Sequence, residues 1–401
     1  MNQTKKYQRN IKLLYAISFV NYLWFWLGVW ALYYLLFTDY IGIGWIETAM
    51  IVTVTLFEIP SGALADLLGR KTTLLLAFAI ITIGNLMEAV AFDFWILFIA
   101  ASVCALGSTM ISGTFEAMTY DTLLKLKQEN IYDKVLAKQK GLQYLAQALA
   151  TLAGGFMYNY IGPRTPFLAV AITSFVALVL TLFLTEPTFI KKVTFSWDNY
   201  KKQFALGFKE LFKDKNRRTI TFILLAGSII PLIIYEMVTD LLLVSYTNNA
   251  VLVSIGVVIM LLAVAVFAPL EKYFSKLTTN SVKLIFALSI FYALLLLIVP
   301  WLNFPLAVAL GSCLSVLSIM IQIFSSKIIN EEVKSSDRAT SLSTFNALIS
   351  IPYIFSAVLI GDAINNSSAP VVTFELGVIM LLMIILVGVY RLKSRPSNIS
   401  Q

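Results

Sequence analysis

Long runs of apolar residues recur along the whole chain and are separated by short polar stretches. Each run is close to the roughly 20 residues that a helix needs to cross a hydrocarbon layer about 30 Å thick. Strands of a membrane barrel would instead alternate in polarity over segments of about ten residues. The pattern therefore predicts an all-α polytopic membrane protein with twelve transmembrane helices. Their approximate bounds are 13–37, 44–66, 72–91, 94–118, 140–161, 166–185, 219–245, 250–271, 281–300, 304–326, 340–361 and 371–390.

The twelve runs form two sets of six around a polar segment. We expect an N-terminal six-helix half over 1–185, a cytoplasmic linker over 186–218 and a C-terminal six-helix half over 219–401. In the linker, apolar residues between Trp197 and Phe212 recur at near-helical spacing among lysines, which predicts an amphipathic helix on the inner leaflet. A disordered linker is the alternative. Two pseudo-symmetric six-helix halves are typical of duplicated secondary transporters.

The basic residues gather in the loops on one side of this arrangement. Of the 30 lysines and arginines, only Arg164 falls in a loop on the opposite side. Because cytoplasmic loops carry the excess of Lys and Arg, both termini are predicted to be cytoplasmic. The net charge of +8 is then explained by topology, and we expect no nucleic-acid partner. The predicted location is the inner or plasma membrane of a prokaryotic cell.

The amino-acid composition limits the kinds of catalytic and metal sites that the chain can form. Hydrophobic residues make up 59% of the 401 residues and charged residues 13%, whereas soluble domains carry roughly 25% charged residues. The absence of histidine excludes HExxH metalloproteases, bis-histidine haem ligation and Ser-His dyads. The only two cysteines, Cys104 and Cys313, lie in apolar runs, and we expect both to be buried structural thiols. We predict no enzyme, no metal site and no cofactor, and any proton chemistry must use carboxylates.

One loop, after the second run, carries a specific motif. Its sequence is Glu58-Ile-Pro-Ser-Gly62-Ala-Leu-Ala-Asp66-Leu-Leu-Gly69-Arg70-Lys71. The pattern G-x-x-x-D-x-x-G-R-K, on the cytoplasmic side of a twelve-helix chain, resembles the signature loop of the major facilitator superfamily. The preceding Glu-x-Pro-x-Gly is similar to the bacterial, multidrug-type efflux branches of that family. The resemblance implies the major facilitator fold over the whole chain.

The motif residues have physical roles that can be stated from the residues themselves. Asp66 lies near the C-terminus of the second helix, where the helix dipole disfavours a negative charge, so it needs a positive partner. That partner is either Arg70 or, as the resemblance suggests, the N-terminus of the eleventh helix after Arg338. Gly69 permits a turn with positive φ. The resemblance further implies a conformational latch made of Gly62, Asp66, Gly69, Arg70, Lys71 and Asp121, although these charges could instead only enforce topology.

Acidic residues at membrane depth are candidates for proton or cation coupling, because ionisable side chains cost about 2.5–3.5 kcal/mol on insertion scales. Glu236 and Asp240, four residues apart in the seventh run, share one helix face, and their repulsion favours binding of a proton or cation. The alternative is that both are hydrated near the outer interface. Glu58 and Glu116 lie towards cytoplasmic helix ends, where a gating role is favoured. Glu88, in the outer part of the third run, is expected to lie away from the cavity.

Polar and aromatic side chains in other runs are candidates to line a substrate cavity. We select Asn21 and Trp24 from the first run, where they recur with Phe25 and Gly28 at helical spacing. Interfacial packing is the alternative for these residues. The amides of the fifth and eleventh runs are further candidates, with interhelical hydrogen bonds as their alternative role. They are Gln143, Gln147 and Asn346.

These features together predict a secondary active transporter that works by rocker-switch alternating access. No nucleotide-binding G-x-x-x-x-G-K-[ST] motif occurs, so a gradient must supply the energy. Carboxylates in the runs, without intramembrane Lys or Arg, predict a negative cavity that favours proton-coupled export of neutral or cationic amphipathic molecules. The alternatives are an uptake or exchange carrier for a sugar, amino acid or lipid-like solute, and a non-transporting receptor.

We expect a monomer whose partners are a small-molecule substrate, protons or another coupling ion, and membrane lipid. Two features depart from the drug–proton antiporters of the family. The fourth run contains no arginine, and the fifth run has Gly154-Gly155 without the proline that often accompanies such glycines.

Overall fold

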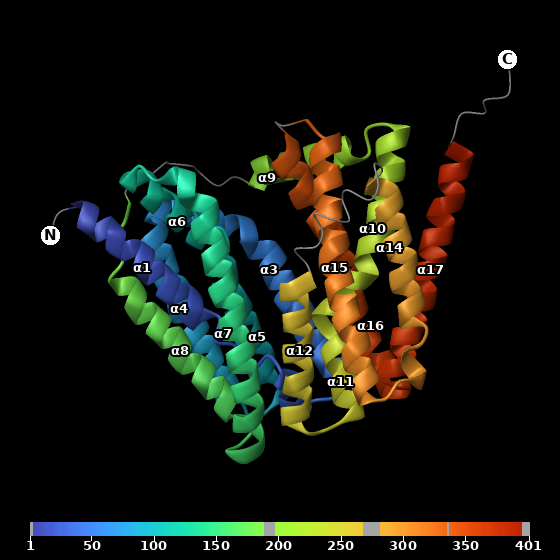
Figure 1. Ribbon diagram of the computed structural model, residues 1–401, viewed down its shortest axis with the longest axis horizontal. Helices are drawn as coiled ribbons and strands as arrows, with labels where there is room; N and C mark the ends of the chain where they lie inside the picture. Colours follow the sequence, from blue (N-terminus) through green and yellow to red (C-terminus); the bar gives the residue numbers. More distant parts are fainter. Residues whose placement is uncertain (1–2, 188–196, 268–280, 335–336, 395–401) are drawn as a thin grey trace. The chain divides into compact units, whose positions relative to one another are not determined.

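The computed structural model describes residues 3–187, 197–267, 281–334 and 337–394 (Figure 1). Within these ranges, the description leaves out the side chains at 59, 62, 63, 66, 197–200, 203, 339, 393 and 394. Every regular element in the described ranges is a helix. The chain divides into two compact units: unit 1 comprises 1–196 and 247–258, and unit 2 comprises 197–246 and 259–401.

Unit 1 is built from eight helices and the beginning of a ninth, α12. They are α1 (Gln3–Asn21), α2 (Trp30–Tyr34), α3 (Tyr40–Leu68), α4 (Arg70–Ala89), α5 (Phe94–Ile111), α6 (Thr114–Leu126), α7 (Tyr132–Tyr160) and α8 (Thr165–Leu182). A 3-10 turn, Glu129–Ile131, precedes α7. Buried apolar side chains of α1, α4, α6 and α8 form the core on the side of the motif loop, and they include Leu14, Leu74, Phe78, Met118 and Ala177.

Unit 2 contains the rest of the helices. They are α9 (Trp197–Leu211), α10 (Lys215–Ile233), α11 (Thr239–Tyr246), the end of α12 (Ala250–Phe267), α14 (Ser281–Leu296), α15 (Phe304–Glu332), α16 (Arg338–Asn366) and α17 (Ala369–Ser394). A π-helical turn, Ile234–Val238, joins α10 to α11, and a 3-10 turn, Val299–Trp301, follows α14. The helical part of the predicted linker, α9, belongs to unit 2 and packs along α16.

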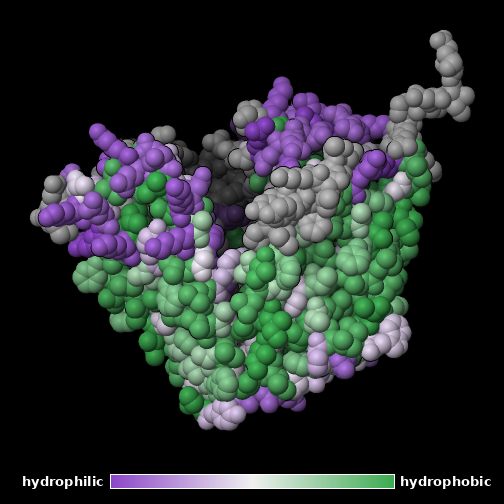
Figure 2. Space-filling model, viewed as in Figure 1, coloured by the Kyte–Doolittle hydropathy of each residue, from purple (hydrophilic) through white to green (hydrophobic). Residues whose placement is uncertain are grey.

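Ten helices of the described chain are long and apolar enough to cross a membrane. They coincide with ten of the twelve predicted runs. Helix α7 covers the run 140–161 up to Tyr160, but it is not among these ten helices. In the space-filling view, hydrophobic residues cover the flanks of the helices. Hydrophilic residues gather at the helix ends around α6 in unit 1 and around α9 in unit 2 (Figure 2). This distribution suits helices whose flanks face hydrocarbon and whose ends face water.

The prediction of one continuous helix over 13–37 is wrong. Helix α1 ends at Asn21, and α2 begins only at Trp30. The indole N–H of Trp24 donates to the carbonyl oxygen of Asn21 at 2.9 Å, which satisfies a carbonyl that has lost its helical partner. The residues predicted at helical spacing therefore do not share a helix face: Asn21, Trp24, Phe25 and Gly28.

Close packing against α7 accounts for the break. A Cβ atom at Gly154 would collide with the carbonyl oxygen of Phe25, so only glycine lets the two backbones approach this closely. A Cβ atom at Gly28 or at Gly155 would likewise collide with the hydroxyl of Ser254, in the part of α12 that belongs to unit 1. An unbroken helix would carry residues 24–29 along a different path and lose these contacts.

Candidate functional site

The motif loop of unit 1 is a turn that is closed by a carboxylate from a distant segment. Gly69 has φ of 89° and ψ of 156°, and it joins α3 to α4. The carboxylate of Glu186 accepts hydrogen bonds from the backbone N–H groups of Arg70, at 3.1 Å, and Lys71, at 2.8 Å. A negative charge at this helix N-terminus satisfies orphan N–H groups and complements the helix dipole.

The side chains of the loop reach two other helices of unit 1. Nε of Arg70 lies 3.7 Å from Oδ2 of Asp121 on α6. Nζ of Lys71 donates to the carbonyl oxygen of Leu182, at the end of α8, at 2.7 Å. Three residues of the predicted latch therefore lie in this loop: Gly69, Arg70 and Lys71. Arg70 pairs with Asp121, the fourth placed member of the predicted latch.

Two members of the predicted latch cannot be placed in the same way. At Gly62 and Asp66 the structure describes only the backbone of α3, and the carboxylate of Asp66 lies outside the description. The pairing of Asp66 with Arg70 or with the start of α16 therefore stays a prediction, as does the latch itself.

The segment that carries Glu186 is fastened to α1. The side-chain amide of Asn10 donates to the carbonyl oxygen of Thr185 at 2.8 Å, and the amide oxygen of Asn10 accepts from the N–H of Thr185 at 2.9 Å. A guanidinium nitrogen of Arg9 donates to the carbonyl oxygen of Phe183 at 2.8 Å. These bonds hold Glu186 against the motif loop, so α1, α4 and α8 meet at one corner of unit 1.

Sequence reasoning missed Glu186. The signal was a lone acid in Thr185-Glu186-Pro187, where the sixth run leaves the membrane on the side of the motif loop. An acid there is unusual among the surrounding lysines and arginines, and an unpaired helix N-terminus is a ready partner for it.

Glu236 of unit 2 lies in the π-helical turn between α10 and α11. The hydroxyl of Thr239 donates to the carbonyl oxygen of Ile234 at 2.7 Å, and Pro231 removes one backbone donor a turn earlier. Single π turns inside α-helices occur frequently at functional sites. Asp240 follows in the first turn of α11 and is half-buried, whereas the side chain of Glu236 is exposed.

The exposure of Glu236 is informative because it lies within the span Lys215–Tyr246. A carboxylate facing hydrocarbon is costly, so the exposure of this acid favours a position at a hydrated surface. No lysine or arginine among the described residues lies within 4.0 Å of its carboxylate. Glu236 can therefore accept a proton or a cationic ligand without first breaking an ion pair.

A cavity of about 730 Å³ opens on unit 2 at the C-terminal part of α15 and the start of α16. Its wall carries charges of both signs, from Lys327, Glu331 and Arg338, beside the amide of Gln322. Nε of Arg338 also donates to the carbonyl oxygen of Val333 at 3.3 Å, which fixes the arginine at the beginning of α16.

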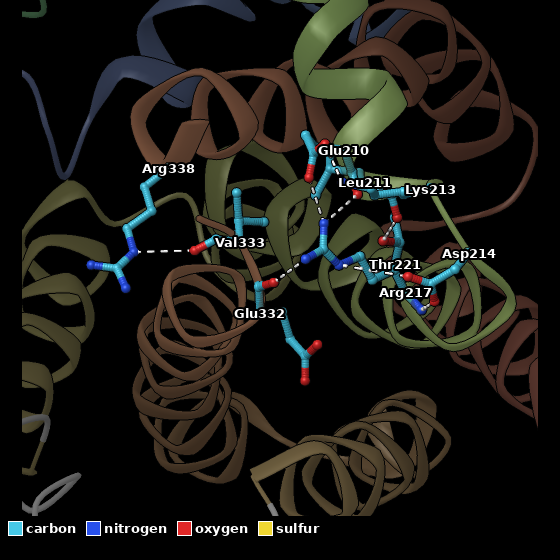
Figure 3. A network of polar contacts seen from close by, with 9 residues as sticks. All are labelled: Glu210, Leu211, Lys213, Asp214, Arg217, Thr221, Glu332, Val333 and Arg338. Atoms are coloured by element: carbon cyan, nitrogen blue, oxygen red, sulfur yellow. Dashed lines mark hydrogen bonds and ion pairs between the residues drawn. The ribbon is translucent and has the colours of Figure 1, made fainter. Parts of the chain in front are cut away.

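Beside this cavity, a polar network joins α9, α10 and α15 (Figure 3). Arg217 bonds the carboxylate of Glu210 at 2.5 Å and the backbone carbonyl of Glu332 at 2.6 Å. Lys213 bonds the other carboxylate oxygen of Glu210 at 2.9 Å. Hydrogen bonds from Lys213 and Arg217 hold the pKa of Glu210 below its ordinary value, because they favour the charged carboxylate. The network was not predicted from the sequence.

The predicted cavity residues have different surroundings. Gln143 is buried and donates to the hydroxyl of Ser18 on α1 at 2.9 Å, which is the interhelical bond that was its alternative role. Gln147, one turn further along α7, is also buried. Asn346 on α16 is exposed. Substrate contact by these residues stays a prediction.

The remaining candidates are at the surface. Glu58 on α3 and Glu116, in the first turn of α6, are both exposed. Both cysteines are free thiols, but the expectation that both are buried is wrong, because Cys313 is exposed and Cys104 is half-buried.

Comparisons with known proteins show which family shares this architecture. The model of the Major Facilitator Superfamily matches residues 14–357. The MFS-type transporter YxaM of Bacillus subtilis (strain 168) is 25% identical over 213 residues, which are 50% of this chain and 49% of that protein. The vesicular acetylcholine transporter of Rattus norvegicus is 28% identical over 127 residues, 32% of this chain and 23% of that protein. The chain thus matches about half or less of the length of these relatives.

Solved structures share the fold over nearly the whole chain. The nucleoside transporter NupG has a TM-score of 0.79 at 16% identity, with 95% of this chain and 98% of that chain covered. An auto-inhibited POT family peptide transporter has a TM-score of 0.73 at 12% identity, with 98% and 99% covered. The predicted fold class, an all-α membrane protein with the fold of these transporters, is confirmed.

Proposed function

Since the chain belongs to the Major Facilitator Superfamily and is a multi-pass membrane transporter of that type, we propose that it exports neutral or cationic amphipathic molecules in exchange for protons. The observation that carries the proposal is the exposed carboxylate of Glu236, in a π turn of a membrane-spanning helix. Without a cation in reach among the described residues, this carboxylate is a binding point for a proton or a positively charged substrate.

The exchange follows from competition for one negative charge. When Glu236 is ionised it attracts a cationic substrate, and when a proton arrives the attraction is lost and the substrate can leave. Alternating exposure of the carboxylate to the two sides of the membrane turns this competition into antiport. The ion pair of Arg70 with Asp121 supports a second element of the proposal, a cytoplasmic latch that must loosen in each cycle.

The test is flux in proteoliposomes under an imposed pH gradient, with a panel of lipophilic cations. Wild type should move several of them, and dissipating the gradient should remove most of the flux. Glu236→Gln should lose the gradient-dependent part, because the amide cannot exchange a proton. Glu129→Gln, which neutralises an exposed acid in the turn before α7, outside the spanning helices, is the matched control and should transport as wild type. Wild-type flux that ignores the pH gradient would refute proton coupling.

An uptake carrier is the second candidate. One partial relative is a vacuolar membrane amino acid uptake transporter of Schizosaccharomyces pombe, 27% identical over 100 residues, and a nucleoside transporter shares the fold. The same vesicles distinguish the two candidates. An uptake carrier should accumulate amino acids or nucleosides on the side to which protons flow, and lipophilic cations should not compete.

A further inference from the structure

Glu88, near the end of α4, is a second acid within a membrane-spanning helix, and it is buried instead of exposed. Only 6% of the residue is accessible, and it lies within the span Arg70–Ala89. Its Oε1 accepts a hydrogen bond from the hydroxyl of Tyr34 at 2.9 Å. The export mechanism proposed above has no role for it.

The partner of Glu88 comes from the short segment that the break in the first helix creates. Within α2, Tyr34 bonds the carboxyl group, and the hydroxyl of the neighbouring Tyr33 donates to the backbone carbonyl of Glu88 at 2.7 Å. Both tyrosines are buried, and the ring of Tyr33 packs on Phe167 of α8 with centroids 4.2 Å apart. Two hydroxyls therefore dock α2 onto the end of α4, and ring contacts with Phe167 pack it against α8.

The surroundings of Glu88 do not compensate a negative charge. Among the described residues, no lysine or arginine lies within 4.0 Å of its carboxyl oxygens. The thiol of Cys104 on α5 faces it, with Sγ against Gly84 one turn earlier, and Glu47 on α3 adds a further acid near Tyr34.

The guanidinium of Arg164, at the N-terminal end of the neighbouring helix α8, is engaged with other groups. Arg164, at the start of α8, faces Tyr33 and donates to the carbonyl oxygen of Ala91 at 2.9 Å. One hydrogen bond from a neutral hydroxyl is little compensation for a buried carboxylate, whereas the neutral carboxylic acid is easily accommodated.

We propose that Glu88 is a proton-binding site of unit 1: docked α2 holds the carboxyl group in its neutral form, and release of α2 admits water and lets the proton leave. The break between Asn21 and Trp30 is what allows α2 to move without α1. The site is separate from Glu236, and its titration can be observed whether or not transport is coupled to protons.

Infrared difference spectroscopy of the purified protein across a pH series tests the site directly. Exposed carboxyl groups ionise near their ordinary pKa of about 4.3, so the C=O band of a protonated carboxyl that persists well above this pH reports a buried acid. In wild type we expect such a band, and we expect it to disappear at alkaline pH. It should be weaker in Glu88→Gln, by the contribution of this one carboxyl group, and unchanged in Glu129→Gln.

A second variant measures the contribution of Tyr34. Its hydroxyl donates to the charged as well as the neutral carboxyl group, and a hydrogen bond to a charged group is the stronger of the two. In Tyr34→Phe, Tyr33 still docks α2 through its hydroxyl and its ring, so only the bond to the carboxyl group is lost, and the band should persist to a pH about one unit higher than in wild type. If Tyr34→Phe does not fold, the comparison of wild type with Glu88→Gln still decides the proposal. A wild-type spectrum without the band, or a band that is as strong in Glu88→Gln as in wild type, overturns it.

Hydrogen exchange tests the link to α2. After correction for the intrinsic pH dependence of exchange, amides of a peptide covering 29–38 should exchange faster in wild type once Glu88 has lost its proton. In Glu88→Gln, which is neutral at every pH, their protection should not change across the same range. Equal pH dependence in the two proteins would contradict the docking role of the protonated acid. Glu236→Gln should behave as wild type here, so failure of proton-coupled export and failure of this site are distinguishable.

Discussion

One carboxylate, that of Glu186, organises the corner of unit 1 at which the motif loop lies. It accepts from two consecutive backbone N–H groups, of Arg70 and Lys71, at the start of α4. It also fills the space next to Gly69, where a Cβ atom would lie 3.0 Å from Oε2. The turn, the helix N-terminus and the carboxylate therefore form one local structure, although 116 positions separate Arg70 from Glu186.

Replacing this carboxylate should destabilise unit 1. Glu186→Gln keeps one acceptor but removes the charge, and Glu186→Ala removes both. Loss of a helix-capping side chain costs about 0.5–2 kcal/mol, so we expect Glu186→Ala to lower the unfolding temperature and Glu186→Gln to lower it by less. Thermal unfolding in detergent measures both. Glu129→Gln, at an exposed acid of the same unit, is the control, and equal curves for it and Glu186→Ala would contradict the capping role.

The network around Glu210 predicts an acid-dependent stability of unit 2. Its bonds from Lys213 and Arg217 give it a lower pKa in the folded chain than in the unfolded chain. Such a group stabilises the fold above its unfolded pKa, about 4.3, and the stabilisation is lost as the pH falls through the folded pKa. Unfolding temperatures measured from neutral to acid pH should fall less steeply for Glu210→Gln than for wild type. Glu331→Gln, an exposed acid of α15, should keep the wild-type slope.

At the scale of elements, the separation of α1 from α2 has a cause that hydropathy cannot show. An apolar run reports the free energy of transfer into hydrocarbon, and the run 13–37 satisfies that criterion whether or not its backbone is helical throughout. The break depends on the hydrogen bond from Trp24 to Asn21 and on the close approach of the Phe25 carbonyl to Gly154. The second contact links residues that are far apart in the sequence. The π turn at Glu236 could not be predicted for the same reason: the hydropathy of a run does not report the conformation of its backbone.

Two glycines of α7 should respond in opposite ways to the same substitution. Gly141 has nothing within 4 Å of the position of a Cβ atom, so Gly141→Ala should stabilise the helix by about 0.5–1 kcal/mol. At Gly154 the methyl group would meet the Phe25 carbonyl, and Gly154→Ala should destabilise by about 1–3 kcal/mol. Unfolding temperatures of the two variants should lie on opposite sides of wild type. Equal shifts would mean that the packing of the break does not hold α7 in place.

At the scale of the whole molecule, the sequence predicted most of what the membrane imposes. Ten of the twelve runs are recovered as spanning helices because the hydrocarbon thickness fixes both their length and their polarity. The motif loop identified the family that the comparison over residues 14–357 shows. What could not be predicted are the pairings between distant residues, such as Glu186 with Lys71 and Tyr34 with Glu88, because no periodicity along the chain encodes them.

The distribution of basic residues makes a prediction for the orientation of the entire chain. If both termini are cytoplasmic, the α6–α7 connection lies inside and the turns after α11 and α16 lie outside. The test starts from a variant in which Cys104 and Cys313 are replaced by alanine. One cysteine is then introduced in each of these three places, at the exposed positions Gln128, Asn248 and Ser367. In intact cells a membrane-impermeant maleimide should label Asn248→Cys and Ser367→Cys. Gln128→Cys should react only after permeabilisation, and the reverse pattern would invert the topology and place the motif loop outside.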